Sequence, residues 1–194
     1  MDETYDKYII PNNIVRSHEL LHLIQGIVED LRELHSMGII HQNLKLQNVL
    51  IVEYNNKTYT RISDIRVIKD HTHLETLKWR AREQMFGEET KETDLFSLGY
   101  FIYFCLTRKE DLFAENLFGR DYNVVEEKKF VNALQNYSKA FNLCAQLLNS
   151  NPKTRPQASM VLHHPLFWDV SKKILFLSVS SDRLEVRCLP QISR

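Results

Sequence analysis

The sequence predicts a mainly α-helical fold of the α+β class, in which one domain of helices contains a single short β-hairpin. Three observations lead to this expectation. Apolar residues recur at helical spacing between Leu20 and Leu34, two β-rich runs flank Asn55-Asn56, and an apolar run ends at Leu106. The chain has 194 residues, of which 43% are hydrophobic, so it can enclose a core of its own.

The first element is a helix that is expected to begin at Ser17. Its apolar residues share one face at helical period: Leu20, Leu23, Ile24, Ile27, Leu31 and Leu34. Ser17 can cap the helix, and Gly38 can end it. Residues 1–16 are a polar lead.

The next stretch carries the polar residues on which a function can be argued. It reads His41-Gln42-Asn43-Leu44-Lys45-Leu46-Gln47-Asn48. Two β-rich runs, 49–52 and 58–62, then surround Asn55-Asn56 and predict a hairpin with a tight turn. Asp64 follows directly after the hairpin.

The second half of the chain predicts further helices around a buried central one. The central helix is expected to begin near Asp94 and to continue through the apolar run to Leu106. Helical patterns follow at 124–134, 138–148 and 156–162. A metal site at His163-His164 is not expected, because adjacent histidines point in different directions and no third ligand is nearby.

Composition excludes several classes of protein. The 25 basic residues balance the 25 acidic ones, so no strong field favours nucleic acid or an anionic membrane. The apolar run before Leu106 is too short to span a bilayer, and the acidic start is unlike a signal peptide. Cys105, Cys144 and Cys188 lie far apart, and two of them sit in apolar helical patterns, which favours buried free thiols. We therefore expect a soluble protein of the cytoplasm or nucleus.

Together these segments resemble the C-terminal lobe of a protein kinase. The stretch His41–Asn48 is similar to the catalytic loop H-R-D-L-x-x-x-N, Asp64 stands where D-F-G begins, and Trp79–Glu83 is similar to W-R-A-P-E. Within kinases the chain is most similar to the inositol-requiring kinase–endoribonuclease of the unfolded-protein response, with ribonuclease L as a cousin. The segments that carry this narrower resemblance are His164–Trp168 and Lys172–Glu185.

The resemblance divides the chain into three parts. After the lead of residues 1–16, residues 17–168 correspond to the kinase C-terminal lobe. Residues 169–194 correspond to the first helix of a ribonuclease-type extension and a tail. No glycine-rich loop precedes residue 38, and about sixteen residues cannot form a five-stranded sheet, so the N-terminal lobe is expected to be missing. Only nine residues follow Glu185, so the remainder of a ribonuclease domain is expected to be missing as well.

The resemblance also assigns roles to single residues. Asn43 and Lys45 would occupy catalytic positions, with Lys45 able to neutralise phosphate. Lys45, Asn48 and Asp64 would contact ATP, and Asn48 and Asp64 would hold Mg²⁺. His41, Glu83, Asp94 and Arg155 would support the structure, with Glu83 and Arg155 as a buried ion pair and Asp94 as the acceptor of catalytic-loop amides.

The sequence departs from the kinase pattern at the position of the catalytic base. Asn43 replaces the aspartate that accepts the substrate proton, and an amide has no basic lone pair near neutral pH. Gln42 and Leu46 replace Arg and Pro in the same loop, and Arg82 replaces the Pro of W-R-A-P-E. Ile65-Arg66 replaces the Phe-Gly of D-F-G.

Three hypotheses remain open from the sequence. The first is a truncated pseudokinase that binds ATP and Mg²⁺ weakly or not at all and regulates a full-length stress-response kinase by protein binding. The second is a serine/threonine protein kinase, or a fragment of one, with residual ATP and Mg²⁺ binding and phosphotransfer. The third is a gene fragment or a mispredicted open reading frame of a longer stress sensor.

Overall fold

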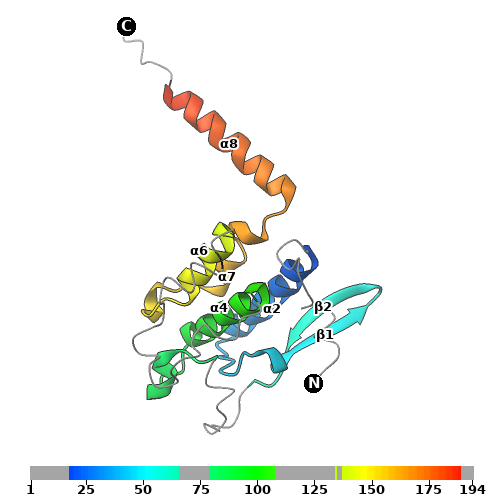
Figure 1. The fold of residues 1–194 in the computed structure, drawn as a ribbon, viewed down its shortest axis with the longest axis vertical. Helices are drawn as coiled ribbons and strands as arrows, with labels where there is room; N and C mark the ends of the chain where they lie inside the picture. Colours follow the sequence, from blue (N-terminus) through cyan, green and yellow to red (C-terminus); the bar gives the residue numbers. More distant parts are fainter. Residues whose placement is uncertain (1–17, 66–78, 108–133, 135–136, 189–194) are drawn as a thin grey trace.

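The structure, a computed structural model, describes residues 18–65, 79–107, 134 and 137–188. Its helices and strands, in chain order, are α2 (His18–Ser36), β1 (Val49–Tyr54), β2 (Lys57–Ile62), α4 (Lys91–Thr107), α6 (Ser138–Leu147), α7 (Ala158–Val161) and α8 (Val170–Cys188). Short 3-10 turns occur at Leu46–Asn48, Arg82–Phe86, Pro152–Thr154 and Pro165–Phe167. The mainly helical fold with one two-stranded antiparallel sheet is confirmed (Figure 1).

Helix α4 is the centre of the fold. Every residue from Thr93 to Leu106 except Phe104 is buried, so the helix is covered on all sides, as the sequence predicts. Gly99 permits the close approach of α6, since a Cβ at this position would lie 2.7 Å from Leu147 Cβ. The buried Trp79 ring meets Tyr100 edge-on, with the ring centroids 4.9 Å apart.

Helix α2 packs its apolar face on this core and ends where the sequence predicts. Gly38 adopts φ +78°, its amide donates to His35 O, and the Ile39 amide donates to Leu34 O. This is a Schellman ending, which satisfies the last carbonyls of the helix. One detail differs from the expected face, because Leu34 is only half-buried and His35 is buried in its place.

The hairpin has the predicted turn at Asn55-Asn56. Both residues adopt positive φ, 50° and 56°, and Tyr54 pairs with Lys57 across a two-residue loop. Asparagine tolerates the left-handed region better than most residues, which explains why this turn forms here.

The hairpin is fixed to α2 by polar contacts. Thr60 Oγ1 donates to Leu23 O at 2.8 Å, and the Ile62 amide donates to Asp30 Oδ2 at 3.0 Å. Burial raises the pKa of the Asp30 carboxyl, although the Ile62 amide and the Arg61 guanidinium oppose that rise. The two strands therefore follow the loop His41–Asn48 at a fixed position beside α2.

The remaining helices confirm most of the pattern in the second half. The helix expected at 138–148 is present as α6, whereas the one expected at 156–162 is shorter, as α7. The helix expected at 124–134 and the lead of residues 1–16 lie outside the described residues, apart from Leu134. Cys105 and Cys144 are buried free thiols, and burial raises the pKa of both.

Helix α8 extends away from the other helices (Figure 1). Near its start, Trp168 packs against Phe176 with the ring centroids 5.1 Å apart, and the indole Nε1 donates to His163 O at 2.8 Å. Among the described residues, no helix is both long and apolar enough to cross a membrane.

Candidate functional site

Asp94, in the first turn of α4, holds the loop that begins at His41. Its Oδ2 accepts the His41 amide and its Oδ1 accepts the Gln42 amide, each at 2.7 Å. His35 Nε2 lies 2.9 Å from the same Oδ2. Gln42 has φ +63°, a conformation that a non-glycine residue adopts at some energetic cost, and the bond to Asp94 holds it there. Two backbone hydrogen bonds to one buried carboxylate thus set the path of the loop, and His35 of α2 contacts the same carboxylate.

The side chain of His41, the first residue of this loop, is fully buried and forms two hydrogen bonds that orient the loop. Its Nε2 donates to Ser63 O at 3.0 Å, and its Nδ1 accepts the Asn43 amide at 3.3 Å. Burial lowers the pKa of His41, although the carboxylates of Asp94 and Asp64 and the Ser63 carbonyl act in the opposite direction. The hydrogen-bond pattern and the lowered pKa agree on a neutral imidazole with its proton on Nε2.

Asn43 and Asn48 are joined across the loop by a neutral hydrogen bond. Asn48 Nδ2 donates to Asn43 O at 2.7 Å, which leaves Asn48 Oδ1 as an oxygen that could bind a cation. Asn43 is half-buried, and its side-chain amide forms no hydrogen bond to a described residue. Lys45 is also half-buried and forms no ion pair within the described part of the chain.

Asp64 lies just beyond the end of β2, close to Asn48. The Ser63 amide donates to Asn48 O at 2.8 Å, and Ser63 Oγ lies 3.4 Å from Asp64 Oδ2. Asp64 is exposed and has φ +58°. The Asn48 amide oxygen and the Asp64 carboxylate are the oxygen ligands that Mg²⁺ prefers, so these two residues could hold it. Within residues 18–65, 79–107, 134 and 137–188, no group of three His, Cys, Asp or Glu side chains could bind a metal.

Glu83 and Arg155, the pair expected from the sequence, are in contact. Arg155 Nη1 donates to Glu83 Oε1 and Nη2 donates to Oε2 at 3.2 Å, which is a bidentate arrangement. Arg155 also donates to Glu92 O at 2.8 Å and to Asn149 O at 2.9 Å, and its guanidinium lies 5.0 Å from the centre of the Phe96 ring. The pair joins the turn at Arg82–Phe86 to the start of α4.

The structure therefore brings five of the candidate residues to one place: His41, Asn43, Asn48, Asp64 and Asp94. Glu83 and Arg155 form a second, structural cluster beside α4. Sequence reasoning missed His35 and Ser63. The only signal for His35 is that it lies four residues after Leu31 on the buried face of α2, where a polar residue needs a partner.

Comparison with known proteins identifies the family to which this chain is similar. Residues 1–167 match the family described as protein kinase domain. Serine/threonine-protein kinase/endoribonuclease IRE1b of Arabidopsis thaliana is 38% identical over 181 residues, which cover 86% of this chain and 20% of that protein. Serine/threonine-protein kinase/endoribonuclease IRE1 of Oryza sativa subsp. japonica is 35% identical over 181 residues. The match covers 87% of this chain and 20% of that protein.

A third relative is described as inactive. The inactive serine/threonine-protein kinase/endoribonuclease IRE1-like of Arabidopsis thaliana is 36% identical over 182 residues, covering 86% of this chain and 32% of that protein. The chain spans about a fifth of the length of the first two relatives.

Proposed function

The chain belongs to the protein kinase family, and we propose that it is a pseudokinase that regulates a full-length kinase by binding to it. The observation that carries the proposal is Asn43, which stands at the place of the catalytic base. Loss of a general base typically lowers a rate by about 10²–10⁴-fold. A relative of this chain is itself described as inactive.

The surroundings of Asn43 support this proposal. The nearest imidazole, His41, cannot replace the base, because its Nε2 donates to Ser63 O and its Nδ1 accepts the Asn43 amide. The Asp94 carboxylate is occupied by the amides of His41 and Gln42. Neither group has an unused basic site directed to a substrate hydroxyl.

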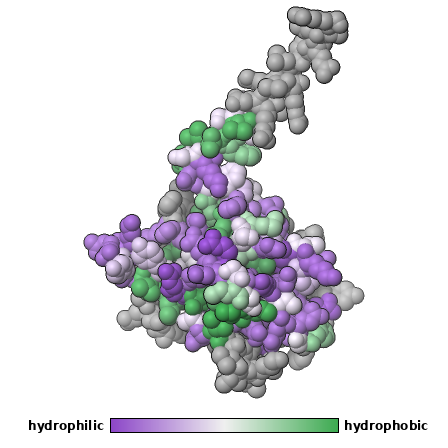
Figure 2. All heavy atoms as spheres, turned by 180° about the vertical axis from the view of Figure 1, so that it is seen from behind, coloured by the Kyte–Doolittle hydropathy of each residue, from purple (hydrophilic) through white to green (hydrophobic). Residues whose placement is uncertain are grey.

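Exposed apolar side chains support a function in protein binding. On the hairpin, Leu50, Val52 and Tyr54 share the outer face of β1, and Tyr59 pairs with Val52. The exposed residues of α8 include Val170, Ile174, Leu175, Phe176 and Leu177, and Figure 2 shows an apolar patch where this helix leaves the body. Contiguous apolar surface of this kind favours contact with another protein. The partner we propose is a full-length kinase of the same stress-response family.

The test is a binding measurement followed by a kinase assay. Purified chain would be mixed with a full-length kinase/endoribonuclease of the unfolded-protein response, and association would be measured by calorimetry. We expect association and a change in autophosphorylation of the full-length kinase. A double variant, Val52→Asp with Tyr54→Asp, should weaken association if the hairpin face takes part. No detectable association with the unchanged chain would overturn the proposal.

A second candidate function is residual phosphotransfer. Protein kinases use ATP and Mg²⁺, and the oxygens of Asn48 and Asp64 together with the Lys45 amine would form the part of that site present here. Radiolabel transfer by the native chain would be compared with transfer by the variant Asn43→Asp, which restores the carboxylate. If the native chain transfers phosphate as fast as this variant, the pseudokinase proposal fails and the second function holds.

Nucleotide binding needs its own measurement. ATP with Mg²⁺ at 100-fold excess over its dissociation constant would raise the free energy of unfolding by roughly 2.7 kcal/mol. The variant Asp64→Asn should remove most of any Mg²⁺-dependent part of this gain, because it replaces the carboxylate ligand.

A further inference from the structure

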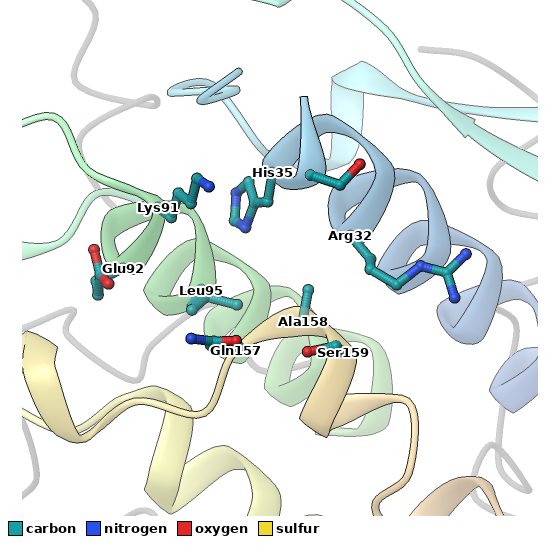
Figure 3. Close-up of a pocket in the computed structure, with 9 residues that line it drawn as sticks. Arg32, His35, Lys91, Glu92, Leu95, Gln157, Ala158 and Ser159 are labelled. Atoms are coloured by element: carbon teal, nitrogen blue, oxygen red, sulfur yellow. The ribbon is translucent and has the colours of Figure 1, made fainter. Parts of the chain in front are cut away.

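Helix α8 is joined to the body of the fold by a short connecting segment, residues 162–169. On one side of this segment the start of α7 is fixed, because Gln157, Ala158 and Ser159 line a pocket together with residues of α2 and α4 (Figure 3). On the other side, α8 extends away from the remaining helices (Figure 1). The direction in which α8 leaves the body therefore depends on how the connecting segment is held.

A 3-10 turn at Pro165–Phe167 gives the connecting segment its shape. Leu166, at the centre of the turn, is buried, and Phe167 packs against the core of the body. The next residue, Trp168, packs its ring against Phe176 of α8. The turn is thus anchored to the core on one side and carries α8 on the other.

His164 closes this turn with one nitrogen of its ring. Nδ1 accepts the Leu166 amide at 3.2 Å. The other nitrogen, Nε2, lies 3.1 Å from Asn142 Oδ1 on α6, an oxygen that also accepts Gln146 Nε2 at 2.7 Å. Because a carbonyl oxygen can only accept, Nε2 carries the proton and Nδ1 is the acceptor. Both bonds therefore require the same neutral tautomer of the ring.

A protonated His164 cannot close the turn in any orientation. The imidazolium has a donor at each nitrogen and no acceptor, so rotation of the ring does not restore a bond to the Leu166 amide. That amide belongs to a buried residue, and a buried donor that loses its acceptor is unfavourable. Uptake of one proton therefore acts directly against the closed turn.

The charge nearest to this ring acts in the same direction. Burial and the Lys139 ammonium of α6 lower the pKa of His164 below its ordinary value of 6.5. His163 and Asp169 flank the ring in the connecting segment, and α2 packs against the turn. Among the described residues, none of these groups, and none on α8, contributes a charge that shifts the pKa of His164. The closed turn thus holds the ring in its neutral form.

We propose that His164 is a pH-sensitive latch, which in its neutral form keeps the connecting segment closed and fixes the direction of α8, and in its protonated form releases both. The open turn binds the proton more tightly than the closed one, so the latch is closed above pH 6.5 and opens as the pH falls from 6.5 through the folded pKa. Release changes where the exposed apolar residues of α8, such as Ile174 and Leu177, are presented.

The first experiment measures the direction of α8 as a function of pH. Spin labels would be attached to the full chain at two exposed positions, Ser150→Cys in the body and Ser181→Cys on α8, with Cys188→Ser to prevent a third label. The cysteines of α4 and α6 are buried and would not react. Double electron–electron resonance should give a narrow distance distribution at about pH 7.5 and a broad one at about pH 5.5. A distribution that stays narrow while NMR shows the His164 ring to be protonated would overturn the proposal.

A matched set of variants separates the latch from a general effect of acid. His164→Asn keeps an acceptor for the Leu166 amide, since asparagine is a preferred capping residue, but it takes up no proton in this range. Its distribution should stay narrow at both pH values, whereas His164→Ala should be broad at both. His163→Asn removes the exposed neighbouring imidazole and should behave as the unchanged chain does. The same pH dependence in His164→Asn as in the unchanged chain would refute the latch.

The last readout follows the turn itself within the folded protein. Circular dichroism and the indole resonance of the buried Trp79 report on the body, and only pH values at which both keep their native form are compared. There, protection of the Leu166 amide, corrected for the intrinsic effect of pH on exchange, should fall by up to about tenfold for each unit by which the pKa of His164 is lowered. His164→Asn should show no such fall. Unchanged protection in the unchanged chain, with its His164 ring protonated, would show that the turn stays closed and would contradict the proposal.

Discussion

Two polar clusters in this chain, the Glu83–Arg155 pair and the Asn43–Asn48 contact, differ in the kind of group that is buried. In the first, a carboxylate and a guanidinium meet in a bidentate ion pair at the base of α4. In the second, the Asn48 side-chain amide donates one neutral hydrogen bond to the backbone carbonyl of Asn43, the residue that the kinase resemblance compares with the catalytic base. The Glu83–Arg155 contact is thus a buried ion pair, whereas the contact between Asn43 and Asn48 carries no charge.

In this chain, the loop His41–Asn48 is held in shape without an aspartate at position 43. The backbone of His41 and Gln42 is fixed by Asp94, and Asn43 contributes its own amide and carbonyl rather than its side chain. The geometry of the loop and the chemistry of its base are therefore separable.

Arg155→Met should destabilise the chain most. It leaves the Glu83 carboxylate buried without its cation and leaves Glu92 O and Asn149 O without their donor. We expect the free energy of unfolding to fall by about 3–5 kcal/mol, measured by urea denaturation. Lys153→Met, an exposed lysine two residues away, is the control and should change stability by less than about 0.5 kcal/mol.

A double-mutant cycle makes this prediction sharper. Glu83→Gln in the Arg155→Met background should restore part of the loss, because it removes the unpaired charge. If both single variants cost less than about 1 kcal/mol, the ion pair does not provide the support that its geometry indicates.

Asp94→Asn should loosen the loop while leaving most of the fold intact. The amide keeps one acceptor oxygen, so one of the His41 and Gln42 amides loses its bond, and the charge that strengthens both is removed. We expect a loss of about 2 kcal/mol and faster hydrogen exchange at these two amides. Amides in the middle of α4 serve as the internal reference, and equal acceleration there would indicate global destabilisation instead.

Most of the fold could be predicted from the sequence because the local preferences of the chain favour the same elements that the packed structure contains. Helical period, the Asn55-Asn56 turn and the Gly38 ending each identify an element by short-range chemistry, and each is present. The contact of Glu83 with Arg155 was expected only from the kinase resemblance, because nothing local joins two residues so far apart in the sequence.

The missed residues share one physical cause. His35 and Ser63 act through bonds to Asp94 and Asn48, and those partners are identified only when α2, α4 and the hairpin are packed together. The roles of Asn43, Lys45 and Asp64 toward a nucleotide stay predictions that the experiments above address.

Gly26→Ala should separate the hairpin from α2. A Cβ at Gly26 would lie 2.4 Å from Thr60 Oγ1, the hydroxyl that donates to Leu23 O. We expect a loss of about 1–3 kcal/mol in thermal or urea unfolding, although alanine is the better helix former.

The sign of this effect should depend on Thr60. In a Thr60→Ala background the clash is absent, and Gly26→Ala should be neutral or stabilising by up to about 1 kcal/mol. If Gly26→Ala is equally harmful in both backgrounds, the contact between α2 and the hairpin is not the one that limits this position.

The smallest effect is a pH dependence that reports on His41. Burial lowers the pKa of this imidazole below its ordinary value of 6.5, so the unfolded chain takes up a proton before the folded chain does. The contribution of His41 to stability is therefore complete above pH 6.5 and is lost as the pH falls from 6.5 through the folded pKa. Each unit by which the pKa is lowered corresponds to about 1.4 kcal/mol.

Urea midpoints measured between about pH 7.5 and about pH 5.5 should show this decline. His164 contributes with the same sign, because burial and Lys139 lower its pKa too, so His164→Gln isolates the part due to His41. If stability in that variant does not fall, the folded chain accepts the proton on His41 beside Asp94. The loop would then rest on a second ion pair, and the contrast between a charged scaffold and a neutral loop would no longer hold.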